Sequence, residues 1–276
     1  MIEIGFIQGR LSPPVQGRIQ AFPRDHWRDE FVLARTHDFP VMEWTLDQDG
    51  LNENPLMTEA GRKEIRDLGR AHDLRIPTLT GDCFMQAPFY KAGGGKRRDL
   101  LGDAARIIEA CADLDLGIIV VPLVDNGALE SAEQEADLRL GLAELAPLLK
   151  AGRVRIAFES DFPPHRLAGF IADLDPDIFG INYDIGNSAA LGYDFREEIA
   201  AYGDRIANVH VKDRLLGGTT VPLGRGAADL AGAIQTLARS GYSGPYMLQT
   251  ARAEDGDHAG ILCAYRDLVL GLLEAA

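Results

Sequence analysis

Short apolar runs alternate with longer amphipathic stretches from one end of the chain to the other. Between the apolar runs, nonpolar residues recur three and four positions apart, as on the buried face of a helix; residues 138–149 are one example. The runs themselves have the length and the β-branched or aromatic content of buried strands. They lie at residues 2–7, 39–44, 74–80, 117–122, 154–160, 178–184, 205–211 and 245–250. The pattern predicts eight strand–helix units.

Eight such units in a chain of 276 residues are typical of a (β/α)8 TIM barrel, an α/β fold in which helices surround a ring of parallel strands. The alternative is a doubly wound open sheet, which usually carries a GxGxxG turn after its first strand. The corresponding segment here is IQGRLSPP, at residues 7–14, and it lacks that pattern. Because no linker or low-complexity tract divides the chain, we expect one domain over residues 1–276.

Two segments contain proline or glycine residues that disfavour a helix. Proline removes a helical hydrogen bond, so we expect Pro147 to kink or end the fourth helix early. The glycine-rich segment AGGGKRR, residues 92–98, is predicted to be a loop before the third helix.

Polar residues stand where the predicted strands end, which is where TIM-barrel enzymes carry their chemistry. Glu43 ends the second strand, and the third runs into Asp82. Because side chains alternate along a strand, the polar positions face the barrel interior and their apolar neighbours face the helices. The last four strands end on Glu159, Asp184, His210 and Gln249.

Inward-facing carboxylates are costly unless they are paired or bind a metal. A set of oxygen and nitrogen donors without a thiolate suits a divalent cation such as Mn²⁺, Mg²⁺, Co²⁺ or Zn²⁺. Taken singly, a strand-end carboxylate could be a helix cap, and His210 could be a hydrogen-bonded core histidine. Four in succession favour a shared metal site of Glu159, Asp184, His210 and Gln249.

Basic residues near the same strand ends could bind a phosphate or carboxylate of a substrate, with loop salt bridges as the alternative. They are Arg10, Lys212, Arg214 and Arg252. Trp44 is a candidate for an apolar wall beside a bound substrate.

The net charge, the cysteine content and the lack of long apolar runs limit the binding partners and the location that we expect for this protein. The net charge of −14 argues against nucleic-acid binding. Three widely spaced cysteines argue against a disulfide framework. The sequence has neither the pattern of a signal peptide nor an apolar run of about 18 residues, so we expect a cytoplasmic protein without membrane spans.

Several motifs together resemble the xylose isomerase-like TIM-barrel superfamily, especially its sugar phosphate isomerase/epimerase branch. They span nearly the whole chain and read GFIQGRLS (5–12), MEWTLD (42–47), FES (158–160), NYDIGNS (182–188) and NVHVKDR (208–214). The resemblance implies a metal-dependent isomerase or epimerase that acts on a small carbohydrate or sugar phosphate by proton transfer through a metal-stabilised enediolate. It also implies that Glu159, Asp184 and His210 are metal ligands and that Glu159 is an acid/base.

Gln249 departs from this resemblance, because family epimerases commonly have a glutamate there. An amide cannot take up a proton near neutral pH, whereas inversion of a carbon needs an acceptor on one face and a donor on the other. The second group would then be Glu43, Asp82 or a metal-bound water.

Four readings of the function stay open at this point. They are an isomerase or epimerase, a metal-dependent lyase or dehydratase, an inactive carbohydrate-binding homologue, and a DNA-repair AP endonuclease, which the acidic charge disfavours. The substrate, the metal and the assembly into a homo-oligomer also stay open.

Overall fold

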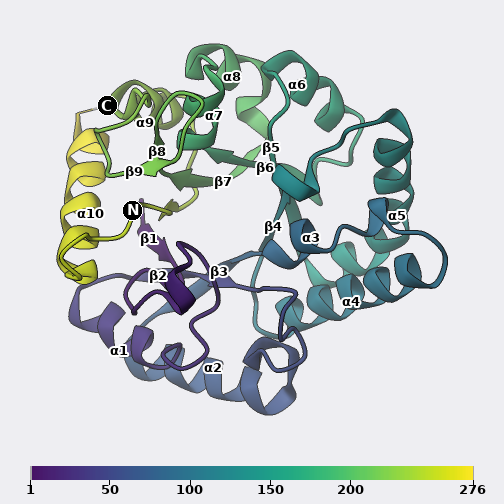
Figure 1. The fold of residues 1–276 in the computed structure, drawn as a ribbon, viewed down its shortest axis with the longest axis horizontal. Coiled ribbons are helices and arrows are strands. Elements are labelled where there is room, and N and C mark those ends of the chain that lie inside the picture. The colour runs from purple at the N-terminus through teal and green to yellow at the C-terminus, as the bar shows by residue number, and fades with distance from the viewer. Residues whose placement is uncertain (1, 276) are drawn as a thin grey trace.

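The computed structural model describes residues 2–275, which form a closed barrel of eight parallel strands ringed by helices (Figure 1). Each strand pairs with its neighbour along the chain, and the pairing of Ile4 with Tyr246 joins the first barrel strand to the last. The strands are β1 (Ile4–Ile7), β2 (Val41–Thr45), β3 (Arg75–Thr80), β4 (Ile118–Leu123), β5 (Arg155–Ser160), β6 (Phe179–Asp184), β7 (Ile206–Val211) and β10 (Tyr246–Leu248). The predicted (β/α)8 barrel is confirmed.

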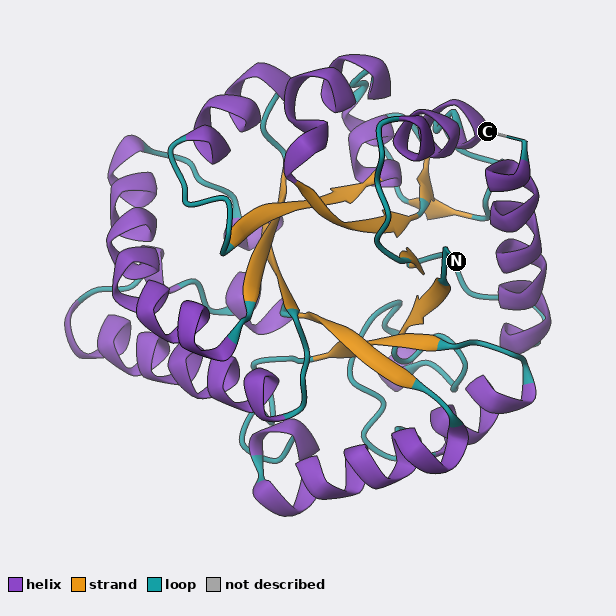
Figure 2. Ribbon diagram, turned by 180° about the vertical axis from the view of Figure 1, so that it is seen from behind, coloured by secondary structure: helices purple, strands orange, loops and turns teal. Residues whose placement is uncertain are grey.

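The helices form the outer layer, as Figure 2 shows from behind. They are α1 (Asp29–Thr36), α2 (Glu59–His72), α3 (Asp82–Gln86), α4 (Gly94–Asp113), α5 (Ala132–Gly152), α6 (Pro164–Ala172), α7 (Ile185–Leu191), α8 (Phe195–Tyr202), α9 (Leu230–Arg239) and α10 (His258–Glu274). After β7, a two-stranded antiparallel sheet of β8 (Asp213–Arg214) and β9 (Thr220–Val221) lies outside the barrel sheet. In residues 2–275 no helix combines the length and apolar character that crossing a membrane requires.

Two local predictions about helix bounds were wrong: the helix does not end early at Pro147, and residues 94–98 are not a loop. Helix α5 continues through Pro147 to Gly152, because Leu145 and Leu149 on either side of the proline are buried and hold the last turns in place. Helix α4 begins at Gly94, so most of the segment 92–98 is helical rather than loop. In α5, packing of the apolar face outweighs the local propensity of proline. The first turn of α4 is largely exposed and leads into a helix whose buried residues begin at Leu100.

The alternation of side chains along β2 separates two neighbouring residues that the sequence had placed in one site. Glu43 faces the barrel interior, whereas Trp44 faces the helices and is 1% exposed. The Trp44 ring contacts Trp27 edge-on at 5.7 Å between centroids and lies 5.5 Å from Phe22, while its Nε1 donates to Asn54 Oδ1 at 3.1 Å. The expectation that Trp44 covers a substrate is therefore not met; it is a core residue with a satisfied hydrogen bond.

Candidate metal centre and active site

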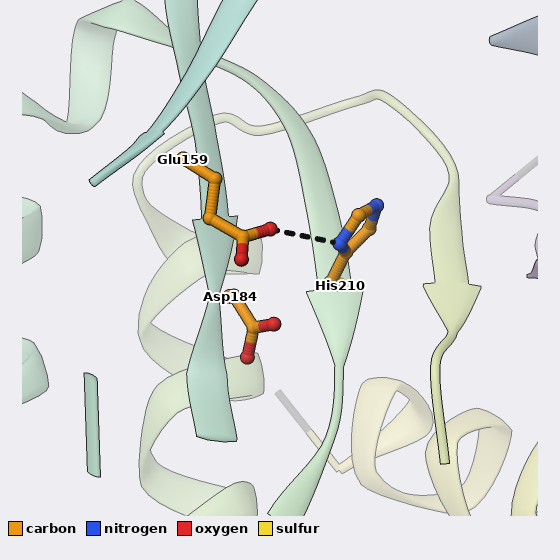
Figure 3. A group of neighbouring side chains, drawn as sticks. All are labelled: Glu159, Asp184 and His210. Atoms are coloured by element: carbon orange, nitrogen blue, oxygen red, sulfur yellow. Dashed lines mark ion pairs between the residues drawn. The ribbon is translucent and has the colours of Figure 1, made fainter. Parts of the chain in front are cut away.

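Three of the four predicted ligands converge at the C-terminal ends of adjacent strands. Glu159 on β5, Asp184 at the end of β6 and His210 on β7 each offer a ligand atom, and these atoms lie within 4.8 Å of one another (Figure 3). His210 Nδ1 is 3.3 Å from Glu159 Oε2, and the sheet register sets Asp184 beside His210. All three side chains are buried.

The electrostatics of this cluster fit a cation. Burial raises the pKa of Asp184, and the nearby Glu159 carboxylate raises it further. Two buried carboxylates at this separation repel each other, and a divalent ion between them would relieve that repulsion. Two carboxylate oxygens and one imidazole nitrogen are donors that Mn²⁺, Mg²⁺, Co²⁺ and Zn²⁺ all accept.

Glu43 orients His210 through the ring nitrogen that points away from Glu159. Its Oε1 lies 2.7 Å from His210 Nε2, so the opposite ring nitrogen, Nδ1, is the one that faces Glu159. Glu43 is fully buried and also accepts hydrogen bonds from the hydroxyls of Thr78 and Thr80. A carboxylate on the second ring nitrogen is the usual partner of a metal-binding histidine.

The contacts of Glu43 bear on its predicted role as an acid/base. Although burial disfavours charge on both groups, the ion pair raises the pKa of His210 to about 10 and keeps the pKa of Glu43 below its ordinary value. Glu43 is not among the residues that line the cavity described below. The expectation that Glu43 exchanges a proton with substrate is therefore not met, and its contacts are those of a positioning residue.

Both oxygens of Glu159 are held by amides. Asn182 Nδ2 donates to Oε2 at 2.8 Å, and Asn187 Nδ2 donates to Oε1 at 2.6 Å. Although burial opposes ionisation, His210 and Lys212 keep the pKa of Glu159 below its ordinary value. Asn187 had not been singled out from the sequence, although it lies within the NYDIGNS motif.

Gln249 lies at the edge of the cluster, beside a lysine. Lys212 Nζ is 3.3 Å from Asp184 Oδ2 and donates to Gln249 Oε1 at 3.0 Å. The ammonium thus links the predicted fourth ligand to one of the three that converge. The two ends of the Gln249 amide have different partners. Its oxygen accepts from Lys212, and its nitrogen, Nε2, donates to Gln20 Oε1 at 3.3 Å.

A cavity of about 490 Å³ opens beside the cluster. Glu159, Lys212 and Gln249 line it on one side, and Asp82, just after β3, lines it on another. Asp82 is 9% exposed. Burial, reinforced by the charges of Asp47 and Glu159, raises the pKa of Asp82 to about 7. The cavity therefore holds a carboxyl group that can gain or lose a proton near neutral pH.

Gln20 joins two walls of the cavity. Its Nε2 donates to Asp82 Oδ2 at 3.1 Å, and its Oε1 accepts from Gln249 and from Arg10 Nη2, the latter at 3.0 Å. Gln20 lies in the loop between β1 and α1, where no strand or helix periodicity indicates its role.

The four basic candidates divide into two groups. Arg10, Lys212 and Arg214 line the cavity. Burial and the neighbouring Arg252 lower the pKa of Arg10 to about 9. Arg252 itself is not among the lining residues; its Nη1 donates to the Ser12 carbonyl at 2.7 Å and so supports the loop that carries Arg10.

A further residue that the sequence did not indicate, Glu30, shapes that loop. Its carboxylate is fully buried and accepts backbone N–H bonds from Gly9 at 2.6 Å and from Leu11 and Ser12 at 3.0 Å each. These contacts fix the backbone on both sides of Arg10. Burial raises the pKa of Glu30, against the effect of the amides.

The comparisons with known proteins agree with this geometry. The profile of the family described as xylose isomerase-like TIM barrel matches residues 31–264. Among curated proteins, the chain is similar to L-ribulose-5-phosphate 3-epimerase UlaE of Escherichia coli, with 27% identity over 266 residues that cover 91% of this chain and 93% of the relative.

Solved structures share the fold at low sequence identity. D-psicose 3-epimerase of Clostridium cellulolyticum H10, solved with D-tagatose, is 12% identical, with a TM-score of 0.76 over 99% of both chains. The IolI protein, solved with a zinc atom, is 17% identical, with a TM-score of 0.76 over 99% of both. A Mycobacterium smegmatis barrel protein in complex with magnesium is 16% identical, with a TM-score of 0.70 over 99% of this chain and 97% of that one.

Proposed function

The chain belongs to the xylose isomerase-like TIM-barrel family, and from that premise we propose that it is a divalent-metal-dependent isomerase or epimerase of a small carbohydrate or sugar phosphate. The observation that carries the proposal is the convergence of Glu159, Asp184 and His210 beside a cavity of about 490 Å³. The relatives named as sugar epimerases support the same reaction class.

Glu159, Asp184 and His210 would hold the ion, with Gln249 as the candidate fourth ligand. When bound, a divalent cation would polarise a carbonyl oxygen of the substrate. Glu159 is the base of the proposal: its carboxylate takes the proton from the carbon next to that carbonyl, while Asn182 and Asn187 keep its oxygens in one orientation.

The cationic side chains of the cavity serve substrate binding. Lys212 and Arg214 donate to hydroxyl, carboxylate or phosphate oxygens from the β7 side, and Arg10 does so from the loop after β1. Arg214 Nη1 also donates to Asn187 Oδ1 at 2.8 Å, so that a contact with substrate is coupled to the amide that holds Glu159.

The proposal is tested by proton exchange. Metal-loaded protein is incubated in D2O with a panel of ketopentoses, ketohexoses and their phosphates, and deuterium next to the carbonyl is followed by NMR. We expect exchange that EDTA abolishes, that added Mn²⁺ or Co²⁺ restores and that Glu159→Gln lacks. The matched control is Glu133→Gln, which alters an exposed acid outside the cavity and leaves exchange in place. Exchange that is equally fast without metal would contradict the proposal.

One observation favours a second candidate, a metal-dependent lyase or dehydratase. Gln249 stands where an epimerase would have its second acid/base, and its amide cannot carry a proton. Elimination needs one base and one Lewis acid, both of which the cluster would supply. An unsaturated product that absorbs in the ultraviolet would identify this reaction.

A further inference from the structure

Resting on the proposed function, we propose that Asp82 is the second acid/base of the site and exchanges the proton on the face of the substrate carbon opposite Glu159. Inversion chemistry is then available to this chain even though its last barrel strand is followed by a glutamine.

The placement of the two carboxyl groups suits the two faces of one carbon. Asp82 follows β3 and Glu159 lies on β5, so the intervening strand, β4, separates them. Val120 and Pro122 of β4 line the cavity between them with apolar surface. A sugar carbon lying against that surface would have one carboxyl group on each side.

The other acidic groups near the cavity are less suited to the role. The carboxylate of Glu43 is already hydrogen-bonded to His210 and to the hydroxyls of Thr78 and Thr80, and Glu43 does not line the cavity. Asp125 does line it but is exposed to solvent. Asp161 also lines the cavity, but it directly follows β5, the strand that carries Glu159, and so lies on the same side as Glu159.

The surroundings of Asp82 leave it available to a substrate. Gln20 Nε2 donates to Oδ2 at 3.1 Å, and the side chain is buried in the lining of the same cavity that Glu159 and Lys212 line from the other side. Burial, Asp47 and Glu159 raise the pKa of Asp82 to about 7, where both protonation states are populated under physiological conditions.

Gln20 connects Asp82 to Gln249, because its Nε2 donates to Asp82 and its Oε1 accepts from Gln249 Nε2. The side-chain oxygen of Gln249 accepts from Lys212. We therefore assign Gln249 a positioning role. Through Gln20 it orients Asp82, whose carboxyl group exchanges the proton that an amide cannot carry.

The proposed step balances in atoms and charge. Glu159 takes the proton from the carbon, and the electron pair of that C–H bond moves into the enediolate. Protonated Asp82 then gives its proton to the opposite face, the electron pair forms the new C–H bond, and the carbonyl returns. Glu159 is left protonated and Asp82 ionised; exchange of protons with solvent, or the reverse reaction, resets both.

The experiment separates exchange from inversion. The metal-loaded, full-length protein is incubated in D2O with the ketose or ketose phosphate that the wild type converts. Deuterium uptake into the starting sugar and formation of its epimer are measured in the same sample. The variants are Asp82→Asn, Asp82→Glu as the conservative replacement, and Asp99→Asn, an exposed aspartate outside the cavity, as the matched control.

We expect Asp82→Asn to lower epimer formation about 100-fold or more, the usual contribution of a general acid, while deuterium uptake stays within a few-fold of the wild type. Asp82→Glu recovers part of the inversion rate, and Asp99→Asn changes neither rate. Continued deuterium uptake also reports that the Asp82→Asn site is folded and loaded with metal.

Two results would overturn the inference alone: wild-type inversion in Asp82→Asn, or loss of exchange together with inversion. If the wild-type protein shows no metal-dependent exchange with any sugar, the proposed function fails and this inference fails with it. The exchange rate of the wild type therefore distinguishes the two failures.

Discussion

His210 Nε2 lies 2.7 Å from Glu43 Oε1, and neither side chain has any exposed surface. Neither residue lines the cavity, and the other ring nitrogen of the histidine faces Glu159. The carboxylate can therefore influence a metal only through the imidazole, by fixing its orientation and raising its basicity.

Glu43→Gln is expected to weaken binding of Mn²⁺ or Co²⁺ about 10- to 100-fold, because the histidine loses the partner that orients it. It should also lower the free energy of unfolding by about 3 to 5 kcal/mol, the usual result of breaking a buried ion pair. Calorimetric metal titration and urea denaturation measure the two effects. The exposed Glu133→Gln serves as control, and unchanged metal affinity in Glu43→Gln would refute the assigned role.

Metal removal is expected to destabilise the protein. A ligand at 100 times its dissociation constant adds about 2.7 kcal/mol to the free energy of unfolding. Scanning calorimetry should therefore show a lower Tm with EDTA than with Mn²⁺, and Asp184→Asn should abolish most of the difference. An identical Tm under both conditions would speak against a metal site at Glu159, Asp184 and His210.

Gln249→Glu is expected to bind divalent metal about tenfold more tightly, because affinity rises with the number of charged ligands. The new carboxylate would stand about where Gln249 Oε1 now accepts from Lys212 at 3.0 Å. It also supplies an acid/base at the end of β10, so the double variant Asp82→Asn with Gln249→Glu should invert the substrate faster than Asp82→Asn alone. Equal inversion rates in the two variants would contradict this.

Asp82→Asn is expected to stabilise the protein at pH 8. The folded-state pKa of Asp82, about 7, lies above its ordinary value because of burial, Asp47 and Glu159, with Gln20 and Lys212 opposing the rise. A carboxyl with a raised pKa contributes stability that is present at low pH and lost as pH rises through the folded pKa. The loss between pH 5 and pH 8 is about 3 kcal/mol.

The measurement is the difference in unfolding free energy between Asp82→Asn and the wild type at both pH values. We expect the variant to gain more at pH 8 than at pH 5. A gain that is independent of pH would show that the carboxyl group does not titrate in this window.

Glu30→Ala is expected to loosen the loop after β1, because three backbone N–H groups lose their shared acceptor. The loop carries Arg10 and Gln20, so we expect KM to rise about tenfold, with a smaller change in the rate of deuterium exchange at saturating substrate. Steady-state kinetics separate the two, and an unchanged KM would show that the loop holds its shape without Glu30.

The barrel was predictable because its signal is repeated eight times. The run predicted at residues 154–160 corresponds to Arg155–Ser160, and the run at 178–184 to Phe179–Asp184. The grouping of Glu159, Asp184 and His210 followed from the same regularity, since adjacent parallel strands end at one rim of a barrel.

Other features depend on contacts that no local pattern encodes. Gln20 and Glu30 act through loop geometry, and Gln20 meets Gln249 across 229 positions of sequence. Trp44 is different: the alternation that turns Glu43 inward turns its neighbour outward, so its place in the core was available from the sequence.

The pairing of β1 with β10 has a consequence for biosynthesis. A ribosome makes the chain from its N-terminal end, so β5, β6 and β7 emerge before β10 can close the ring. The nascent protein then possesses Glu159, Asp184 and His210 while Gln20 still lacks Gln249. The cavity, which Gln249 lines, is accordingly complete only once the last strand has been made.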